Sequence, residues 1–266
     1  MIGAIIGDIV GSRFEFNNIK TKKFDLFGSG CCYTDDSVMS LAIAKAILES
    51  DGDKSKLGAT AERLMRKLGR EYLCCGFGGM FFNWLLSEDP KPYKSFGNGS
   101  AMRVSACGFA AKNVEEAKEL SKAVTEITHN HPEGIKGAEA VAVCVFLAKE
   151  GCSRRQIGEY VKKNYYPINF TLNEIRATYK FNETCQKTVP QAIAAFLEST
   201  SFEDAIRNAV SIGGDSDTLG AIAGAIAEAF YGVPDRIRSG TRPYLDDTLY
   251  NILTEFEAVY PPKKGI

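Results

Sequence analysis

Residues 213–231 read GGDSDTLGAIAGAIAEAFY, and the expected fold is built outward from this stretch. After the acidic start, small and apolar residues continue, and Gly220 and Gly224 stand four apart, so they share one helical face. The first eleven residues, MIGAIIGDIVG, repeat glycine at the same spacing from Gly3 onward. Glycine inside a helix costs about 1 kcal/mol relative to alanine. Close approach of two helices at the centre of a bundle is the simplest compensation.

Helical periodicity continues through most of the chain. The spacing of apolar residues predicts helices near 2–12, 36–50, 57–74, 77–86, 100–111, 114–126, 133–149, 153–163, 188–198, 202–212, 217–231 and 244–258. Ser153 and Gln156 have the spacing of a capping box, and Pro132 stands at a first helical position. The best strand candidate, 208–212, continues a helical pattern, and the strand–helix alternation of a parallel sheet is missing. We expect an all-α fold, a compact orthogonal helical bundle, with residues 1–266 as one domain.

Composition narrows the class of protein. A 45% hydrophobic and 24% charged chain of 266 residues can bury one sizeable core. A net charge of −1 provides no global field for nucleic acid or anionic membrane. No run of about 18 apolar residues could span a membrane, and the N-terminus lacks the basic start of a signal peptide. The eight cysteines have no CxxC spacing, which favours reduced, structural thiols. We expect a cytoplasmic monomer without membrane or bulk nucleic-acid binding.

Two short acidic motifs carry the chemical interest. Residues 34–37 (TDDS) open the apolar helix near 38–48, and residues 213–218 (GGDSDT) open the helix at 219–231. Helix capping is the simpler interpretation, because Asp, Ser and Thr at a helix start satisfy free N–H groups and suit the helix dipole. Capping needs only one or two such residues, whereas each start here carries two carboxylates and a threonine.

The two motifs together favour a metal site. If their helices lie side by side, four carboxylates converge, repel one another and raise one another's pKa unless cations lie between them. The donors are all oxygen atoms, which favours Mg²⁺, Mn²⁺ or Ca²⁺ over Zn²⁺. Four carboxylates and two hydroxyls are enough for two ions that keep open positions for water or substrate.

Motifs along most of the chain resemble the ADP-ribosylglycohydrolase family, which includes the dinitrogenase-reductase activating glycohydrolases. They occur in the family's order: Gly7-Asp8 through Gly11-Ser12 and Glu15, then Thr34-Asp35-Asp36-Ser37, Gly97-Asn98-Gly99-Ser100-Ala101-Met102-Arg103, Thr128-His129-Asn130-His131-Pro132 and Gly213-Gly214-Asp215-Ser216-Asp217-Thr218. Each motif is weak alone, and their shared order makes the match specific.

The resemblance implies an all-α enzyme with two Mg²⁺ or Mn²⁺ ions. By matching positions, Thr34, Asp35, Asp36 and Asp217 would hold one ion, and Asp215, Asp217 and Thr218 the other. The family cleaves the glycosidic bond between the distal ribose of ADP-ribose and a side chain. The expected substrate is an ADP-ribosylated protein or a small ADP-ribosyl compound, and the product is ADP-ribose. Ribose hydroxyls that bind the ions would fix C1″ beside an activated water, and an oxocarbenium-like transition state would follow.

Three further regions have both a simple and a functional interpretation. Glu15 is either a solvated residue after the first helix or the family's glutamate beside the metals, which handles a water or a leaving-group proton. The 97–100 loop is either a turn with Ser100 capping a helix from about Ala101, or a backbone cradle for a diphosphate. The resemblance predicts that ADP-ribose lies along Gly97, Asn98, Gly99, Ser100 and Met102. His131 is either a capping or core-edge histidine, or by resemblance a ligand of ribose or phosphate.

Other readings stay open at this point. The chain could be a catalytically silent ADP-ribose-binding or structural relative, although Glu15 and the ligand positions are intact. Residues 215–218 also match the DxDxT signature of haloacid-dehalogenase-type phosphatases, which normally follows a hydrophobic strand. The segments 17–30 and 164–187 carry no prediction, and the lysines at 20, 22 and 23 are a solvated basic turn or steer phosphate.

Overall fold

The computed structural model describes residues 1–261, which are helical and contain no β-strand. The elements are α1 (Ile2–Ser12), α2 (Asp35–Ser50), α3 (Lys54–Glu71), α4 (Gly79–Leu86), η1 (Asn98–Ser100), α5 (Ser105–Ala110), α6 (Val114–Thr125), α7 (Pro132–Lys149), α8 (Arg154–Asn164), α9 (Leu172–Ile175), α10 (Cys185–Leu197), α11 (Phe202–Ser211), α12 (Ser216–Tyr231), α13 (Asp235–Thr241), η2 (Arg242–Tyr244) and α14 (Asp247–Val259). An isolated antiparallel bridge joins Gly97 and Thr184.

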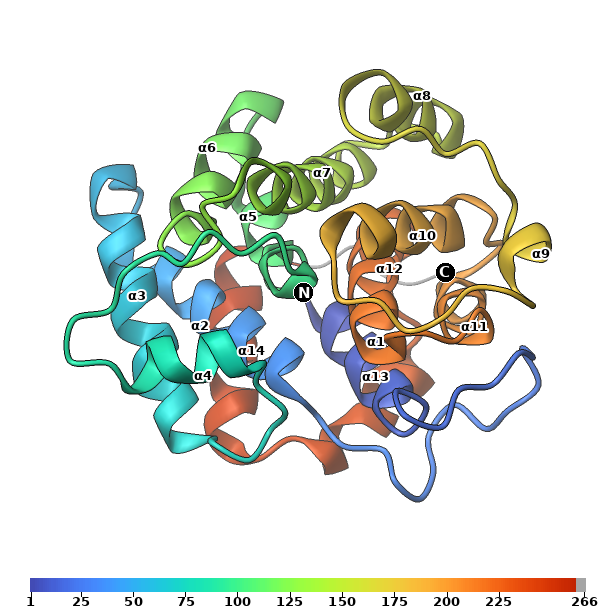
Figure 1. Ribbon diagram of the computed structural model, residues 1–266, viewed down its shortest axis with the longest axis horizontal. Helices are drawn as coiled ribbons and strands as arrows, with labels where there is room; N and C mark the ends of the chain where they lie inside the picture. Colours follow the sequence, from blue (N-terminus) through green and yellow to red (C-terminus); the bar gives the residue numbers. More distant parts are fainter. Residues whose placement is uncertain (262–266) are drawn as a thin grey trace.

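Helices α1 and α12 form the centre of the bundle and lie antiparallel to one another (Figure 1). Their glycines face each other, so that a methyl group on Gly7 would overlap the carbonyl of Gly220, and one on Gly224 would overlap the carbonyl of Gly3. The expected reason for the glycine spacing is therefore confirmed: the two backbones touch. Because the helices are antiparallel, the C-terminal end of α1 lies beside the N-terminal end of α12.

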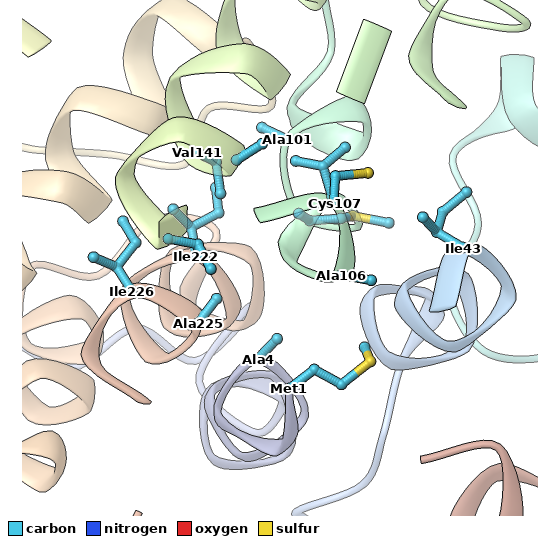
Figure 2. Close-up of a cluster of buried hydrophobic side chains, with 14 of the residues drawn as sticks. Met1, Ala4, Ile43, Ala101, Ala106, Cys107, Val141, Ile222, Ala225 and Ile226 are labelled. Atoms are coloured by element: carbon cyan, nitrogen blue, oxygen red, sulfur yellow. The ribbon is translucent and has the colours of Figure 1, made fainter. Parts of the chain in front are cut away.

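The remaining helices pack around this pair. Helices α7, α10 and α11 contact α12, whereas α2 contacts α1 and carries α3 and α14 on its other sides (Figure 1). Figure 2 shows Ala4 of α1, Ile43 of α2, Cys107 of α5, Val141 of α7 and Ile222 of α12 converging in one apolar cluster. These side chains are essentially fully buried, and this burial fixes the α12 N-terminus inside the bundle.

The all-α prediction is confirmed, with local corrections. The capping box of Ser153 and Gln156 and the first helical position of Pro132 are present. The strand candidate at 208–212 lies at the end of α11. A phosphatase of the haloacid-dehalogenase type is excluded, since no strand precedes residues 215–218 in the described part of the chain.

The predicted helix at 100–111 is wrong in its first half. Residues 98–100 form the short 3₁₀ helix η1, and α5 begins only at Ser105. The amides of Ala101 and Met102 both donate to the carbonyl of Asn98, and Val104 leaves the helical region at φ −92° and ψ 7°. Ser100 therefore closes a turn and does not cap a helix from Ala101. The short helices α9 and α13 were not predicted at all.

Within residues 1–261, none of the helices combines the length and the apolar character that a membrane span requires. The assignment of residues 1–266 to one domain stays a prediction, and residues 262–266 lie outside the described part.

Candidate metal centre and cavity

The start of α2 is held by a carboxylate from α1. Asp8 is fully buried and accepts hydrogen bonds from the backbone N–H of Thr34 (2.9 Å), from its hydroxyl (2.7 Å) and from the N–H of Ser37 (3.0 Å). The Ser37 hydroxyl donates to the same carboxylate. Burial raises the pKa of Asp8 to about 6, although these hydrogen bonds act in the opposite direction. The 34–37 motif is thereby fixed beside the C-terminal half of α1.

The start of α12 is shaped by two glycines in the left-handed region. Gly213 has φ +67° and Gly214 has φ +82°, values that side-chain-bearing residues rarely adopt. The turn delivers Asp215 to the N-cap of α12, where its carboxylate makes no capping bond. Instead, Asp215 Oδ2 accepts a 2.6 Å hydrogen bond from the Asn98 carboxamide. The N-cap carboxylate is thus directed away from its own helix.

The two acidic motifs meet, as the sequence predicted. The Thr218 hydroxyl of α12 donates to Asp36 Oδ2 of α2 at 3.3 Å. Carboxylate oxygens of Glu15, Asp215 and Asp217 lie within 4.8 Å of one another. Glu15 itself is half-buried just beyond the end of α1, and burial together with the charge of Asp215 raises its pKa to about 7.

Within residues 1–261, none of these carboxylates forms an ion pair with a basic side chain. The buried Arg103 lines the same cavity and interacts electrostatically with Asp35, but it does not pair with it. Burial and then the charges of Asp8 and Asp215 raise the pKa of Asp35 to about 8. Burial is also the largest cause of the raised pKa of Asp36 and of Asp217. The buried oxygen Oδ1 of Asp36 has no hydrogen-bond partner. A buried anionic oxygen without a donor is costly unless a cation satisfies it.

The donor set therefore suits hard divalent cations. It consists of carboxylates and threonine hydroxyls, with no thiolate or imidazole donor among the residues just described. Thr34 Oγ1 donates its proton to Asp8, and Thr218 Oγ1 donates to Asp36, so each hydroxyl oxygen keeps a lone pair for another partner.

The carboxylates form one end of a cavity of about 450 Å³. Its wall also contains the start of α4, where Gly78 and Gly79 expose backbone rather than side chains. The 97–99 turn, Tyr93 and His129 line the rest of it. A pocket of this size, lined by both carboxylates and glycine backbone, can enclose a polar ligand larger than a single sugar.

Not all of the residues predicted to contact substrate line the cavity. Gly97, Asn98, Gly99 and Met102 line the cavity. Ser100 is buried, and its hydroxyl donates to the carbonyls of Gly97 (3.1 Å) and Gly134 (2.9 Å), so it fixes the turn.

His131 is an N-cap, one of the interpretations left open by the sequence. Its Nδ1 accepts from the N–H of Glu133 at 3.1 Å, and its ring packs edge-on against Phe96. The histidine that lines the cavity is His129, which is 5% exposed and pairs with the Thr128 hydroxyl at 2.8 Å. Burial and the charge of Arg103 lower the pKa of His129, so the ring that faces the cavity is neutral.

Several residues of the site were missed by sequence reasoning. Asp8 is part of a motif that resembles the family, but the sequence assigns it no role, although a lone carboxylate in an apolar helix was an available signal. The stretch GFGG at 76–79, with Gly76 at φ +103°, had the signature of exposed backbone before a helix. Tyr93 and Glu183 lie in loops, where no periodicity marks them.

Comparisons with known proteins agree with this geometry. A family model described as ADP-ribosylglycohydrolase matches residues 1–262. The relative ADP-ribosylhydrolase ARH3 of Bos taurus is 23% identical over 311 residues, with 88% of this chain and 84% of the relative covered. ADP-ribosylarginine hydrolase Tri1 of Pseudomonas putida (strain GB-1) is 26% identical over 263 residues, with 88% and 70% covered. A solved structure named "ADP-ribosylglycohydrolase-related protein complex" has a TM-score of 0.69 at 21% identity and covers 97% of this chain and 94% of its own, which shows the shared fold.

Proposed function

This chain belongs to the ADP-ribosylglycohydrolase family and is an ADP-ribosyl glycohydrolase, and we propose that it depends on Mg²⁺ and releases ADP-ribose from a modified target. The observation that supports the proposal is the convergence of two acidic motifs, whose carboxylates have no ion-pair partner among the described residues, in the wall of a cavity. The bond to be cleaved is the glycosidic bond at C1″ of the distal ribose.

Two Mg²⁺ (or Mn²⁺) ions fit this donor set. Thr34, Asp35, Asp36 and Asp217 would hold one ion, and Asp215, Asp217 and Thr218 the other. The unpartnered Asp36 Oδ1 supports this assignment, because a cation would satisfy it. Burial and then the neighbouring carboxylates raise the pKa of Asp36 and Asp217, and a bound cation would favour their charged forms. When bound, such ions supply Lewis-acid polarisation of water and ribose hydroxyl oxygens.

Glu15 is the proton-handling group of the proposal. It lies against Asp215 and Asp217 and has a pKa raised to about 7, so near neutral pH it can either take or give a proton. As a base it would orient and deprotonate the attacking water, and as an acid it would protonate the leaving group. Both roles remain open.

The ADP part of the substrate is assigned to the side of the cavity formed by the start of α4. The first turn of α4 has no side-chain cap, and Gly78 and Gly79 allow a ligand to approach its free N–H groups. A helix N-terminus with exposed amides favours a phosphate group. The 97–99 turn and the neutral ring of His129 would contact the ribose and diphosphate between this side and the carboxylates.

The target side carries features that favour a cationic leaving group. Glu183 lines the cavity near Glu15, and Phe16 and Phe181 expose 80% and 40% of their area and stack at 6.1 Å. A guanidinium carries a positive charge and N–H groups that bind carboxylates, and it stacks on aromatic rings, whereas the substituted oxygen of an ADP-ribosylated serine has neither charge nor donor. The relative Tri1 is named an ADP-ribosylarginine hydrolase. We therefore propose arginine-linked ADP-ribose as the preferred substrate.

Release of ADP-ribose from peptides of defined linkage tests both levels of the proposal. Arginine- and serine-linked peptides are incubated with the enzyme, with Mg²⁺ or with EDTA. With Mg²⁺ we expect release of ADP-ribose from the arginine-linked peptide, and with EDTA we expect no release from it. Release from neither peptide contradicts the proposed hydrolase, and equal release in EDTA contradicts the metal dependence.

A matched pair of variants tests the linkage. Glu183→Gln should lower kcat/KM for the arginine-linked peptide about tenfold, the effect of a lost charged hydrogen bond. It should leave the serine-linked rate unchanged. Glu255→Gln, which changes a surface carboxylate that pairs with Lys45, serves as the control. Equal loss on both substrates would remove the preference for arginine.

A further inference from the structure

Glu15 lies outside any regular element, so its place relative to the metal centre depends on what holds the chain after α1. The backbone offers little: the N–H of Phe14 bonds Gly11 O at 2.8 Å, and that of Glu15 bonds Ser12 O at 3.3 Å. Both bonds reach back into α1 and none reaches toward α12. The contacts with the start of α12 come from side chains. The Ser216 hydroxyl of α12 donates to the Phe14 carbonyl at the long distance of 3.5 Å, and a side chain of the segment itself makes shorter bonds.

That side chain is Asn18. Its Nδ2 donates to the carbonyls of Phe14 (2.7 Å), Glu15 (2.9 Å) and Gly214 (2.8 Å), so that two N–H groups are shared among three acceptors. Its Oδ1 accepts from the N–H of Gly214 at 2.7 Å. One carboxamide thus binds the backbone of Glu15 and both polar groups of Gly214, the residue directly before Asp215.

The backbone conformation of the loop at Gly213 and Gly214 favours this contact. Gly213 and Gly214 are both left-handed, which turns the Gly214 peptide toward Asn18. The Lys20 ammonium donates to Tyr179 O at 2.7 Å and to Ile212 O, at the C-terminal end of α11. Lys20 is exposed, as the interpretation of a solvated basic turn implies, but its ammonium also ties the segment to the backbone before Gly213.

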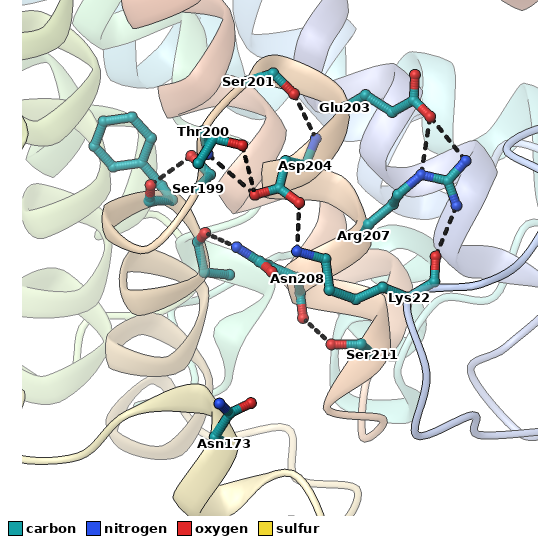
Figure 3. Close-up of polar contacts among 12 residues, drawn as sticks. Lys22, Asn173, Ser199, Thr200, Ser201, Glu203, Asp204, Arg207, Asn208 and Ser211 are labelled. Atoms are coloured by element: carbon teal, nitrogen blue, oxygen red, sulfur yellow. Dashed lines mark hydrogen bonds and ion pairs between the residues drawn. The ribbon is translucent and has the colours of Figure 1, made fainter.

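The other end of the segment is anchored separately on α11. Figure 3 shows the Lys22 ammonium paired with Asp204 and the Arg207 guanidinium donating to the carbonyl of Lys22. Arg207 also donates to Phe24 O at 2.6 Å. Residues 14–24 are thus bound along α11 and at its junction with α12, and Asn18 is the contact nearest to Glu15.

We infer that Asn18 is a positioning residue, whose carboxamide sets the position of Glu15 relative to Asp215 and Asp217. The inference rests on the proposed role of Glu15. An alanine at position 18 would free the Glu15 segment from the Gly214 peptide. An aspartate would be worse, because a carboxylate oxygen would face three carbonyl oxygens at the place where an amide now donates.

Single-turnover kinetics at saturating Mg²⁺ test the inference. Asn18→Ala should lower kcat about 10- to 100-fold, the order expected when a catalytic group is misplaced by about 1 Å. KM should stay within about threefold, and Asn18→Asp should lose more than Asn18→Ala. The control is Asn164→Ala, which removes an asparagine that donates to a backbone carbonyl (Tyr160 O, 2.8 Å) on a distant surface helix. A wild-type kcat for Asn18→Ala overturns the inference.

A double-mutant cycle separates positioning from general damage. If Asn18 acts through Glu15, then adding Asn18→Ala to Glu15→Gln should lower the residual rate by less than about twofold. If Asn18 merely stabilises the fold or the metal ligands, the two losses multiply, and the inference fails.

Amide hydrogen exchange tests the contact between Asn18 and Gly214 without any substrate. The N–H of Gly214 should exchange at least about tenfold faster in Asn18→Ala than in wild type, and at the wild-type rate in Asn164→Ala. Unchanged exchange in Asn18→Ala overturns the inference. If the wild-type enzyme releases ADP-ribose from no substrate, the proposed function fails on its own, while this exchange rate still decides whether Asn18 holds the loop.

Discussion

At one end of the α1–α12 pair, Glu228 is fully buried beside the amino group of Met1, while at the other end Asp8, Asp36 and Asp217 are buried beside one another. Glu228 accepts from the Met1 amino group at 2.9 Å and from the N–H of Gly3 at 2.7 Å. Both ends lie in the same close helix contact, yet only one of them is electrostatically complete.

The neighbours of Glu228 extend the same contrast. The Met1 amino group also reaches Glu257 at 3.2 Å, and Arg238 pairs with Glu257 from its other side. Burial alone would raise the pKa of Glu257, but these cations outweigh it and lower the pKa. A buried carboxylate in this fold is thus paired by the protein itself, unless it belongs to the site. This difference indicates that the carboxylates at the other end, which we call the unpaired end, are arranged to bind a cation that the protein itself does not supply.

The largest expected effect separates proton handling from metal binding at the unpaired end. Glu15→Gln should keep the metals and ADP-ribose affinity, because the amide is nearly isosteric, but turnover should fall by about 10² to 10⁴. Asp217→Asn removes a charge assigned to both ions, so metal occupancy and activity should fall together. Metal titration calorimetry and single-turnover rates distinguish the two variants. Near-normal turnover of Glu15→Gln would leave Glu15 without a catalytic role.

At the paired end, Glu228→Gln should destabilise the protein without affecting the chemistry. Removing one partner of a buried ion pair costs about 3 to 5 kcal/mol. Urea unfolding should show this loss, whereas kcat per folded molecule and Mg²⁺ affinity should stay at wild-type values. Glu255→Gln, which breaks the exposed pair with Lys45, should cost less than about 1 kcal/mol. A matching loss of Mg²⁺ binding in Glu228→Gln would show that the two ends are not independent.

The stability of the metal-free protein should depend on pH through the carboxylates at the unpaired end. Asp8, Glu15 and Asp35 have pKa values raised to about 6, 7 and 8, so the folded state holds protons that the unfolded state releases. Their contribution to stability is complete below about pH 4 and is lost as the pH rises to about 8. For the fully buried Asp8 the shift from 3.8 to about 6 corresponds to roughly 3 kcal/mol.

Urea unfolding in EDTA at pH 5 and pH 8 measures this loss. Asp36→Asn should make the metal-free protein more stable at pH 8, because one repelling charge is removed. Saturating Mg²⁺ should stabilise wild type at pH 8 and should stabilise Asp36→Asn less. A metal-free protein that becomes more stable between pH 5 and pH 8 would contradict the unpaired cluster.

The smallest expected effect compares two histidines. His129→Ala should weaken ADP-ribose binding about fivefold, as for one lost neutral hydrogen bond. His131→Ala should cost about 1 kcal/mol of stability through its lost N-cap and leave binding unchanged. Calorimetry with ADP-ribose and thermal unfolding check both. Weakened binding in His131→Ala alone would restore the assignment that the sequence suggested.

The long helices and both acidic motifs could be predicted because their signals are local. Glycine every fourth residue in α1 and α12 and carboxylates at the starts of α2 and α12 are patterns within one element. Even the meeting of the two motifs followed from the assumption that those helices pack together. The family resemblance added the order of motifs and the enzyme class.

The missed parts depend on contacts between elements. Asp8 matters only because α2 places Thr34 and Ser37 against it. Asn98 lines the cavity, and its predicted contact with substrate stays a prediction, but the hydrogen bond from its carboxamide to Asp215, 117 residues away, could not be predicted from the sequence. Helices α9 and α13 are too short for periodicity to show. Which of His129 and His131 faces the cavity depends on the residue at which α7 starts. The spacing of the two histidines does not determine this.

The most direct test of the central claim is the anomalous scattering of crystals soaked in Mn²⁺. The account predicts two peaks, roughly 3.5–4 Å apart as in paired catalytic metal sites, between Asp36 and Asp217. The same soak of Asp217→Asn should lose occupancy at both positions. Strong peaks elsewhere, with none between these two aspartates, would contradict the account, because the buried carboxylates would then have no cation to pair with.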